Sequence, residues 1–288
     1  MNELTNLSVF NEETGEIIQY LTKDEIEFLR NNYTSATKGI GRINDKNIRR
    51  SDDLFCQFIN ETCGSFYFNY YNKLEMNQYS FRFMYICTFM NYKGYLEFGN
   101  AKNEGRLCTK KDLMEILALG KSEYYKTFNY LLDNNLIKID ENDFICVNTE
   151  ICIKGKIKSK KEVVRMFDSG IREIYKNSLP KEHKKLSVLI KILPYIHHDL
   201  NVVCQDPTEE YVELIKPLTL TELAKKLEYS TTQKLRKGLM DLKVNGEPVI
   251  MISKINNKDM LVVNPKIYYK GGNIEKMEGI INLFKIAK

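Results

Sequence analysis

A cluster of hydrogen-bonding and cationic side chains occupies the first half of segment 231–243, which reads TTQKLRKGLMDLK. Its members are Thr231, Thr232, Gln233, Lys234, Arg236 and Lys237. Gln and Arg can form paired hydrogen bonds to adenine and guanine respectively, and Lys can bind backbone phosphates. In a helix that enters the major groove, the N-terminal half reaches the base edges. The pattern therefore indicates a surface for duplex DNA, although lysines on a helix are also common as ordinary solvated side chains.

Other segments carry weaker versions of the same chemistry. A less basic cluster lies earlier in the chain and comprises Lys121, Ser122, Tyr124, Lys126 and Asn129. Further lysines follow or lie within predicted hairpins, and they could neutralise phosphates without reading sequence: Lys154, Lys156, Lys158, Lys254 and Lys258. The segment K38GIGRINDKNIRR50 contains Arg42, Arg49 and Arg50 and has two interpretations, an arm that enters a minor groove or a solvated linker.

Catalytic and cofactor patterns are missing from the sequence. It has no G-x-x-x-x-G-K-[ST] phosphate loop and no Ser/His/Asp or Cys/His arrangement. His197 and His198 are adjacent, so on a regular element they point in different directions and are not placed to share a metal ion. We therefore expect neither enzymatic activity nor a bound cofactor or metal.

Composition and charge favour a folded, cytoplasmic protein with a polyanionic partner. The chain has 288 residues with 43% hydrophobic residues, and its seven cysteines are scattered without a Cys-x-x-Cys pair, as expected of reduced thiols. No apolar run approaches the length of a membrane span, and the N-terminus has no export signal. Of the net charge of +5, residues 1–34 contribute −5, residues 35–160 contribute +4 and residues 161–288 contribute +6. The basic segments favour nucleic acid but do not establish it.

An internal repeat organises the chain. T109KKDLMEIL117 resembles T219LTELAKKL227 at an offset of 110, and F83MYICTFMNYKGYLEF98 lies over L189IKILPYIHHDLNVVC204 at an offset of 106. The segments VNTEICIKG at 147–155 and VNPKIYYKG at 263–271 match at an offset of 116. The order of segments is the same in both copies, so the sequence predicts one structural unit present twice.

Each copy predicts the same series of elements. Periodicity, threonine caps and polar turns place a long helix, a short extended run, a short helix, a tight turn, a second helix and a β-hairpin in that order. In the first copy the ranges are 79–92, 95–98, 109–118, 119–122, 122–134 and 136–147, and in the second 183–197, 201–204, 219–228, 229–232, 231–243 and 249–264. Gly120 is predicted to supply the backbone freedom of the first turn. The inward stripe of the helix at 122–134 is predicted to contain Tyr125, Phe128, Leu131 and Leu132.

These elements predict an α+β fold, mainly α, with tandem winged-helix domains. We expect an N-terminal hairpin, short helix and basic arm at 1–54, a first winged helix at 55–158, and a second at 159–288 that ends in a short helix. The aromatic run F66YFNYY71 could stack on single-stranded bases, but core packing is the preferred interpretation.

The chain contains the motifs E13TGEII18 in the leader and N264PKIYYKG271 after the last predicted strand. With these two motifs it resembles the winged-helix replication proteins of plasmids and phages of low-GC Gram-positive bacteria. The resemblance implies an initiator that recognises repeats in origin DNA and recruits host replication proteins. The first copy departs from the pattern, because VNTEICIKG lacks the proline and the helix before it is weakly basic, so its alternatives are DNA binding, homodimer formation or contact with another protein. Relatives in that family act as transcription regulators or repressors, so this role stays open. A third interpretation, from another class, is an adaptor that binds only proteins.

Overall fold

The computed structural model divides the chain into two compact units, Met1–Leu54 and Phe55–Lys288. It describes residues 8–10, 17–20, 64–69, 74–99, 105–155, 163–244, 246–255, 258–271 and 274–286. In the first unit, β1 (Ser8–Phe10) and β2 (Ile17–Tyr20) pair antiparallel, which confirms the predicted hairpin. The predicted short helix near residues 22–31 and the basic arm with Arg42, Arg49 and Arg50 lie outside the described residues.

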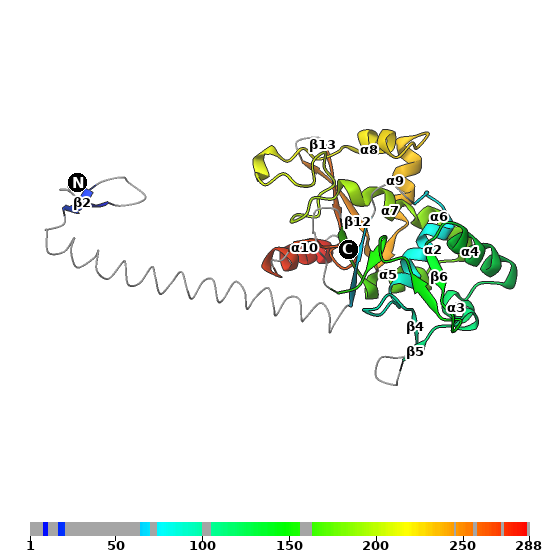
Figure 1. The fold of residues 1–288 in the computed structure, drawn as a ribbon. Helices are drawn as coiled ribbons and strands as arrows, with labels where there is room; N and C mark the ends of the chain where they lie inside the picture. The colour runs from blue at the N-terminus through cyan, green and yellow to red at the C-terminus, as the bar shows by residue number, and fades with distance from the viewer. Residues whose placement is uncertain are drawn as a thin grey trace. The chain divides into compact units, whose positions relative to one another are not determined.

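The second unit is a mixed α+β structure with small sheets (Figure 1). Residues 64–155, called the first half, contain β3 (Ser65–Phe68), α2 (Gln78–Cys87), β4 (Glu97–Phe98), β5 (Arg106–Leu107), α3 (Lys110–Leu117), α4 (Lys121–Asp133), β6 (Ile137–Ile139), β7 (Ile145–Val147) and β8 (Cys152–Ile153). Residues 163–286, called the second half, begin with β9 (Val164–Phe167), α5 (Asp168–Lys176), η2 (Pro180–Glu182), α6 (His183–Leu186), α7 (Val188–Ile192) and η3 (Leu193–Tyr195). They continue with η4 (Val212–Leu214), α8 (Leu220–Lys226), α9 (Thr232–Met240), β10 (Lys243–Val244), β11 (Glu247–Pro248), β12 (Ile250–Ile255), β13 (Lys258–Val263) and α10 (Ile274–Ile286).

Equivalent backbone hydrogen bonds recur in the two halves. In the first half Val147 donates to the carbonyl of Gly94 at 2.8 Å, and in the second half Val263 donates to the carbonyl of Asn201 at 2.9 Å. Both acceptor residues have positive φ, 88° for Gly94 and 54° for Asn201, a region that Gly and Asn adopt more readily than other residues. The repeat seen in the sequence is therefore also a repeat of local backbone structure.

The structure shifts one segment of the predicted alignment by one residue. The offset of 106 aligns Leu96 with Val202. In the structure, however, the backbone hydrogen bond equivalent to that of Leu96 is made by Val203. Leu96 donates to the carbonyl of Ile145 at 2.9 Å, and Val203 donates to the carbonyl of Leu261 at 2.8 Å. Both are fully buried. Because successive residues of an extended chain face opposite sides, a shift of one residue exchanges the buried and exposed positions.

The turn between α3 and α4 is made by a residue that the sequence did not suggest. Gly120 was predicted to supply the unusual backbone conformation, but its φ is −59°, which any residue adopts. The left-handed residue is Ala118, with φ of 48°, and the equivalent turn after α8 uses Glu228, with φ of 57°. The prediction was wrong about the residue because the local sequence contains a glycine close to, but not at, the left-handed position.

The long helix predicted at 183–197 is interrupted. α6 ends at Leu186, α7 spans Val188–Ile192, and η3 follows with Pro194 in its first turns. Proline has no backbone N–H to donate within a helix, which accounts for the end of the α-helical ladder after Ile192 but not for the earlier break at Ser187. The equivalent helix of the first half, α2, lacks proline and runs unbroken from its Asn77 cap, whose side chain accepts from the N–H groups of Tyr79 and Ser80.

Strand pairing joins the two halves. β3 is the central strand of a three-stranded sheet, with β8 from its own half on one side and β9 from the second half on the other. Met166 of β9 in turn forms a bridge with Tyr268, which follows the second hairpin as Cys152 follows the first. Each half therefore places the segment after its hairpin beside its own first strand, and the two first strands pair with each other.

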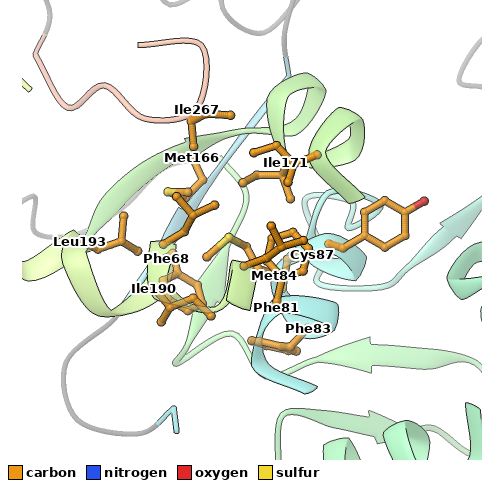
Figure 2. Packing of buried hydrophobic residues seen from close by; sticks show 14 of the residues in the cluster. Phe68, Phe81, Phe83, Met84, Cys87, Met166, Ile171, Ile190, Leu193 and Ile267 are labelled. Carbon is orange, nitrogen blue, oxygen red and sulfur yellow. The ribbon is translucent and has the colours of Figure 1, made fainter. Parts of the chain in front are cut away.

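One hydrophobic cluster runs through both halves. Figure 2 shows Phe68, Phe81 and Met84 from the first half packed with Ile171 and Ile190, among others, from the second. A smaller cluster lies between β13 and α10, where Phe284 is fully buried. The aromatic run at 66–71 supplies two fully buried phenylalanines, so the predicted core role is confirmed for them. The halves therefore fold around a common core.

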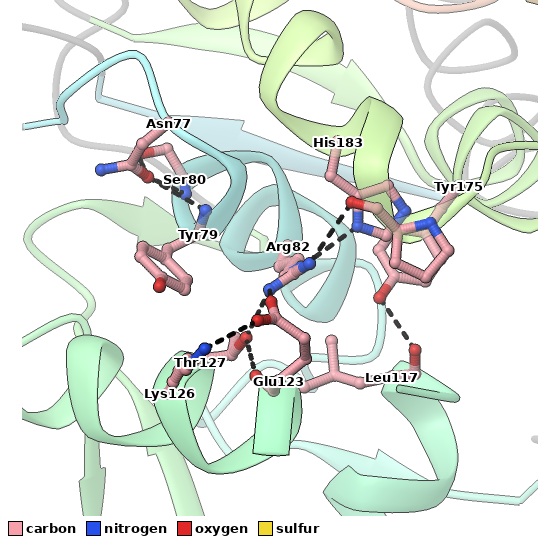
Figure 3. A network of polar contacts seen from close by, with 11 residues as sticks. Asn77, Tyr79, Ser80, Arg82, Leu117, Glu123, Lys126, Thr127, Tyr175 and His183 are labelled. Carbon is pink, nitrogen blue, oxygen red and sulfur yellow. Dashed lines mark hydrogen bonds and ion pairs between the residues drawn. The ribbon is translucent and has the colours of Figure 1, made fainter. Parts of the chain in front are cut away.

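A buried arginine adds a polar link between the halves (Figure 3). The guanidinium of Arg82 on α2 donates to Thr127 Oγ1 at 2.7 Å and to Nδ1 of His183 at 3.1 Å, and it pairs with Glu123 at 3.2 Å. Arg82 is 1% exposed. Because Nδ1 of His183 accepts the hydrogen bond from the Nε–H group of Arg82, the proton of the neutral imidazole must lie on Nε2.

The pKa of His183 predicts loss of stability in mild acid. Burial, with the positive charge of Arg82, lowers that pKa from 6.5 to about 4. The unfolded chain therefore binds a proton at pH 5 that the folded chain does not, so stability falls as pH drops below about 6.5. We expect His183 to contribute a loss of about 2 kcal/mol between pH 7 and pH 5, as the difference between the wild type and a variant without this imidazole in urea unfolding. In His183→Gln, which is less stable at pH 7, this slope should shrink; equal slopes in both proteins would contradict the assignment.

Candidate nucleic-acid interface

The helix–turn–helix of the second half is positioned by an N-terminal cap. Thr219 caps α8: its backbone N–H donates to Glu222 Oε2 at 2.8 Å, and its Oγ1 accepts from the N–H of Glu222 at 3.2 Å. This reciprocal pair satisfies two backbone donors of the first turn. Leu223 and Ala224 face the core. The capped helix thus fixes the point from which the following turn and α9 depart.

α9 has one buried and one exposed face. Leu235 and Leu239, one helical turn apart, are fully buried. Gln233 and Lys237 lie on the opposite side of the helix and are exposed. The buried leucines hold the helix, and the opposite face is free to meet a partner.

The exposed face of α9 carries uncompensated positive charge. Lys234, Arg236 and Lys237 are all exposed, and none makes an ion pair with any residue for which the structure gives a position. The ammonium group of Lys234 donates to Ser230 Oγ at 3.0 Å and to no carboxylate among the described residues. The sole acidic residue between 231 and 241 is Asp241 at the C-terminal end. Three cations within four positions are therefore available to bind phosphates or base edges.

The two threonines at the start of α9 differ in availability. Thr231 is exposed, but its Oγ1 caps the helix by accepting from the backbone N–H of Lys234 at 3.3 Å. Its hydroxyl proton can still be donated outward, because capping uses only a lone pair. Thr232 is half-buried. Of the six residues predicted at 231–237, five are exposed: Thr231, Gln233, Lys234, Arg236 and Lys237.

A long hairpin follows α9. β12 and β13 pair over six residues each, from Ile250–Val263 to Ile255–Lys258, whereas β6 and β7 of the first half pair over three. Both predicted hairpins are confirmed, the second longer than expected. Lys254 and Lys258 lie at its distal end by their backbone positions, and their side chains fall outside the described part of the chain.

The corresponding helix of the first half presents a less basic surface. Lys121, Ser122 and Asn129 of α4 are exposed as predicted. Lys126 is exposed too, but its ammonium pairs with Glu123 at 3.3 Å. The same carboxylate pairs with Arg82, and these two cations lower its pKa. Ion pairing thus offsets charge on α4 that remains free on α9.

Tyr124 and Tyr125 exchange their predicted roles. Tyr124, predicted as a DNA contact, is fully buried, and its hydroxyl donates to the carbonyl of Lys110 at 2.6 Å. Tyr125, predicted to face inward, is 38% exposed. The buried stripe is Tyr124, Phe128 and Leu131, with the i, i+4, i+7 spacing of one helix face. Adjacent tyrosines are chemically alike, so only the orientation of α4 against the core decides between them.

Among the other basic residues, one predicted contact forms an ion pair within the protein, and two exposed lysines were not predicted. Lys154 pairs with the buried carboxylate of Asp168 at 3.1 Å, so it serves the fold, and Lys156 and Lys158 lie outside the described residues. Sequence reasoning did not single out Lys225 or Lys243, which are exposed on the segments just before and after the turn and α9. Their only sequence signal is charge near a helix end, which is common for dipole reasons alone.

Among the described residues no group of His, Cys, Asp and Glu could hold a metal ion, and no helix is both long and apolar enough to cross a membrane. His197 is buried, and its Nε2 lies 2.8 Å from the carbonyl oxygen of Glu209. Comparisons with protein-family models, curated proteins and solved structures found no significant match to this chain. Function is therefore argued from the surface of the chain itself.

Proposed function

We propose that the protein binds duplex DNA, with α9 in the major groove and the β12–β13 hairpin on the phosphate backbone, as in a winged helix. The observation that carries this proposal is the exposed triad of Lys234, Arg236 and Lys237, which form no ion pair with the described residues, on a helix whose other face is held by buried leucines. Gln233 and Arg236 have the chemistry for base recognition, and the lysines for phosphate binding.

The proposal treats the two halves as tandem winged helices of unequal function. The repeated order of helices, turn and hairpin, with its equivalent hydrogen bonds, supports a common origin of the halves. The charge difference between α4 and α9 supports placing the main DNA contact on the second half. The first half then adds a weaker contact or a protein contact.

The test compares two triple variants in binding to a fluorescent duplex at several salt concentrations. Lys234→Ala/Arg236→Ala/Lys237→Ala should weaken binding about tenfold or more, and flatten the salt slope by about one unit per lost phosphate contact. Lys110→Ala/Lys121→Ala/Lys126→Ala removes the same charge from the first half and should cost much less affinity. Equal effects of the two variants would overturn the assignment to α9, and no binding at low salt would overturn DNA binding itself.

The particular role we propose is a replication initiator of a plasmid or phage. Its support is the resemblance carried by E13TGEII18 and N264PKIYYKG271. A transcription regulator would use the same interface, so the location of the bound sites separates the roles. A genome-wide binding map should show clustered repeats at an origin; sites confined to promoters would indicate regulation.

A further inference from the structure

The loop at 205–217 combines exposed apolar side chains with acidic charge. Tyr211, Val212 and Leu214 are 66%, 63% and 58% exposed. The segment contains four acidic residues and one lysine, giving it a net charge of −3 in a chain of net charge +5. The acidic charge disfavours contact with DNA, and large apolar side chains exposed together typically mark a protein contact.

The loop is held in place rather than free to collapse onto the surface. Its ends meet in a bridge between Cys204 and Pro217. The buried ring of His197 accepts at Nδ1 from the N–H of Asp199 at 3.1 Å, so its Nε2 carries the proton and donates to the carbonyl of Glu209 at 2.8 Å. These anchors fix the base of the loop while the apolar side chains of η4 point outward. Little conformational entropy is then lost when they dock.

A complementary surface lies elsewhere in the second unit. A pocket of about 600 Å³ is formed where α2, the end of α3 and α5 meet, with aromatic walls that include Tyr85, Phe89 and Phe98. His183 also lines it, and its buried Nε2 has no hydrogen-bond partner among the described residues. That N–H is a donor suited to an incoming hydroxyl or carboxylate.

A basic segment, 176–185, borders this pocket and contributes Lys176, Ser178, Pro180 and His183 to its wall. The segment contains four exposed lysines, Lys176, Lys181, Lys184 and Lys185, and one acidic residue, Glu182. Lys176 lines the pocket together with Glu115, whereas Lys181 and Lys184 line a neighbouring pocket that shares Pro180. The segment's net charge of +3 is opposite and equal to that of the loop. Leu179 in the same segment is 55% exposed and extends the apolar area. No residue of 205–217 lines the pocket of its own chain.

We propose that the loop at 205–217 of one copy docks into this pocket of a second copy, so that the chain self-associates head to tail. The apolar side chains of η4 enter the aromatic pocket, and the loop carboxylates face the lysines of 176–185. Loop and pocket are different surfaces, so the contact is heterologous and can continue from copy to copy. The inference does not depend on DNA binding and is tested without DNA.

Sedimentation velocity on the full chain at low salt tests the contact. The weight-average mass should rise with concentration between about 10 and 500 µM, as for a small, weak interface. Tyr211→Ser/Leu214→Ser should weaken association at least about tenfold. Tyr92→Ser, a substitution at a tyrosine that is 72% exposed in the first half, is the control and should leave it unchanged. A wild-type chain that stays monomeric throughout would overturn the proposal.

Mixing two variants distinguishes head-to-tail docking from a symmetric contact. Lys176→Glu/Lys181→Glu alters two exposed residues, one that lines the pocket and one that follows Pro180 of its wall, and should weaken association about threefold to tenfold. Mixed with Tyr211→Ser/Leu214→Ser, it should form dimers but nothing larger, because one intact loop meets one intact pocket. A mixture no more associated than the variants alone would overturn the proposal.

A charge exchange completes the design. Adding Glu210→Lys/Glu213→Lys to Lys176→Glu/Lys181→Glu in one chain restores opposite charges on loop and pocket edge, and should recover most of the lost association. All four side chains belong to exposed residues, so folding is retained. No recovery would show that these surfaces do not face each other.

Discussion

Gly170→Ala is expected to destabilise the protein by about 3 kcal/mol, because a methyl group at this position would clash with neighbouring atoms. Gly170 lies in α5, where a Cβ would overlap with the backbone carbonyl oxygen of Lys266 and come within 2.7 Å of Ile267 Cδ1. A backbone carbonyl cannot rotate away as a side chain can, so α5 must shift against the segment that follows the second hairpin. Urea unfolding at pH 7 measures the loss.

Gly238→Ala provides the matched control. Gly238 lies in α9, and a Cβ there would meet no atom within 4 Å. The same substitution should therefore stabilise the protein by about 0.5–1 kcal/mol, because alanine loses less backbone entropy than glycine in a helix. Opposite signs for the two variants are the expected result. A loss of less than 1 kcal/mol for Gly170→Ala would contradict the close approach of α5.

Arg82→Met should cost about 3 kcal/mol of stability. Methionine fills much of the space but donates no hydrogen bond, so Thr127 and Nδ1 of His183 lose a buried partner and Glu123 loses its pair. Removing one member of a buried polar network leaves the others desolvated without compensation. Chemical unfolding measures the change, and DNA affinity below the transition should remain that of the wild type, because Arg82 is buried away from solvent.

Arg106→Met is the comparison for Arg82→Met. Arg106 also forms an ion pair, with Asp112 at 2.6 Å, but its side chain is 58% exposed. Asp112 keeps its bonds from the backbone and hydroxyl of Thr109. We expect a smaller loss of about 1–2 kcal/mol, since the Arg106 side chain is largely in solvent and the buried carboxylate of Asp112 keeps its bonds from Thr109. If the two variants were equally stable, the network around Arg82 would not be a link between the halves.

Three tertiary features could not be predicted from the sequence, because each depends on contacts between distant segments. The pairing of β3 with β9 joins residues about one hundred positions apart, and neither strand has a neighbour in sequence that predicts its partner. The burial of Arg82 depends on three segments meeting at one point. The predicted boundary between residues 158 and 159 falls inside the second unit, where both halves contribute to one core. Each depends on long-range contacts that leave little local pattern.

Sequence alone determined the local elements of this protein: the capped helices after Thr109 and Thr219, the hairpins, and the basic composition of 231–243. These follow from short-range physics, since caps, helical periodicity and turns act over a few residues. Tertiary structure decided which residues of each pattern are exposed and available to bind a partner. It buried Tyr124 and exposed Tyr125, and it paired Lys126 with Glu123. It left Lys234, Arg236 and Lys237 exposed and without an ion pair in the part of the chain that the structure describes. Orientation against a core and proximity to a distant charge are set only when the whole chain packs.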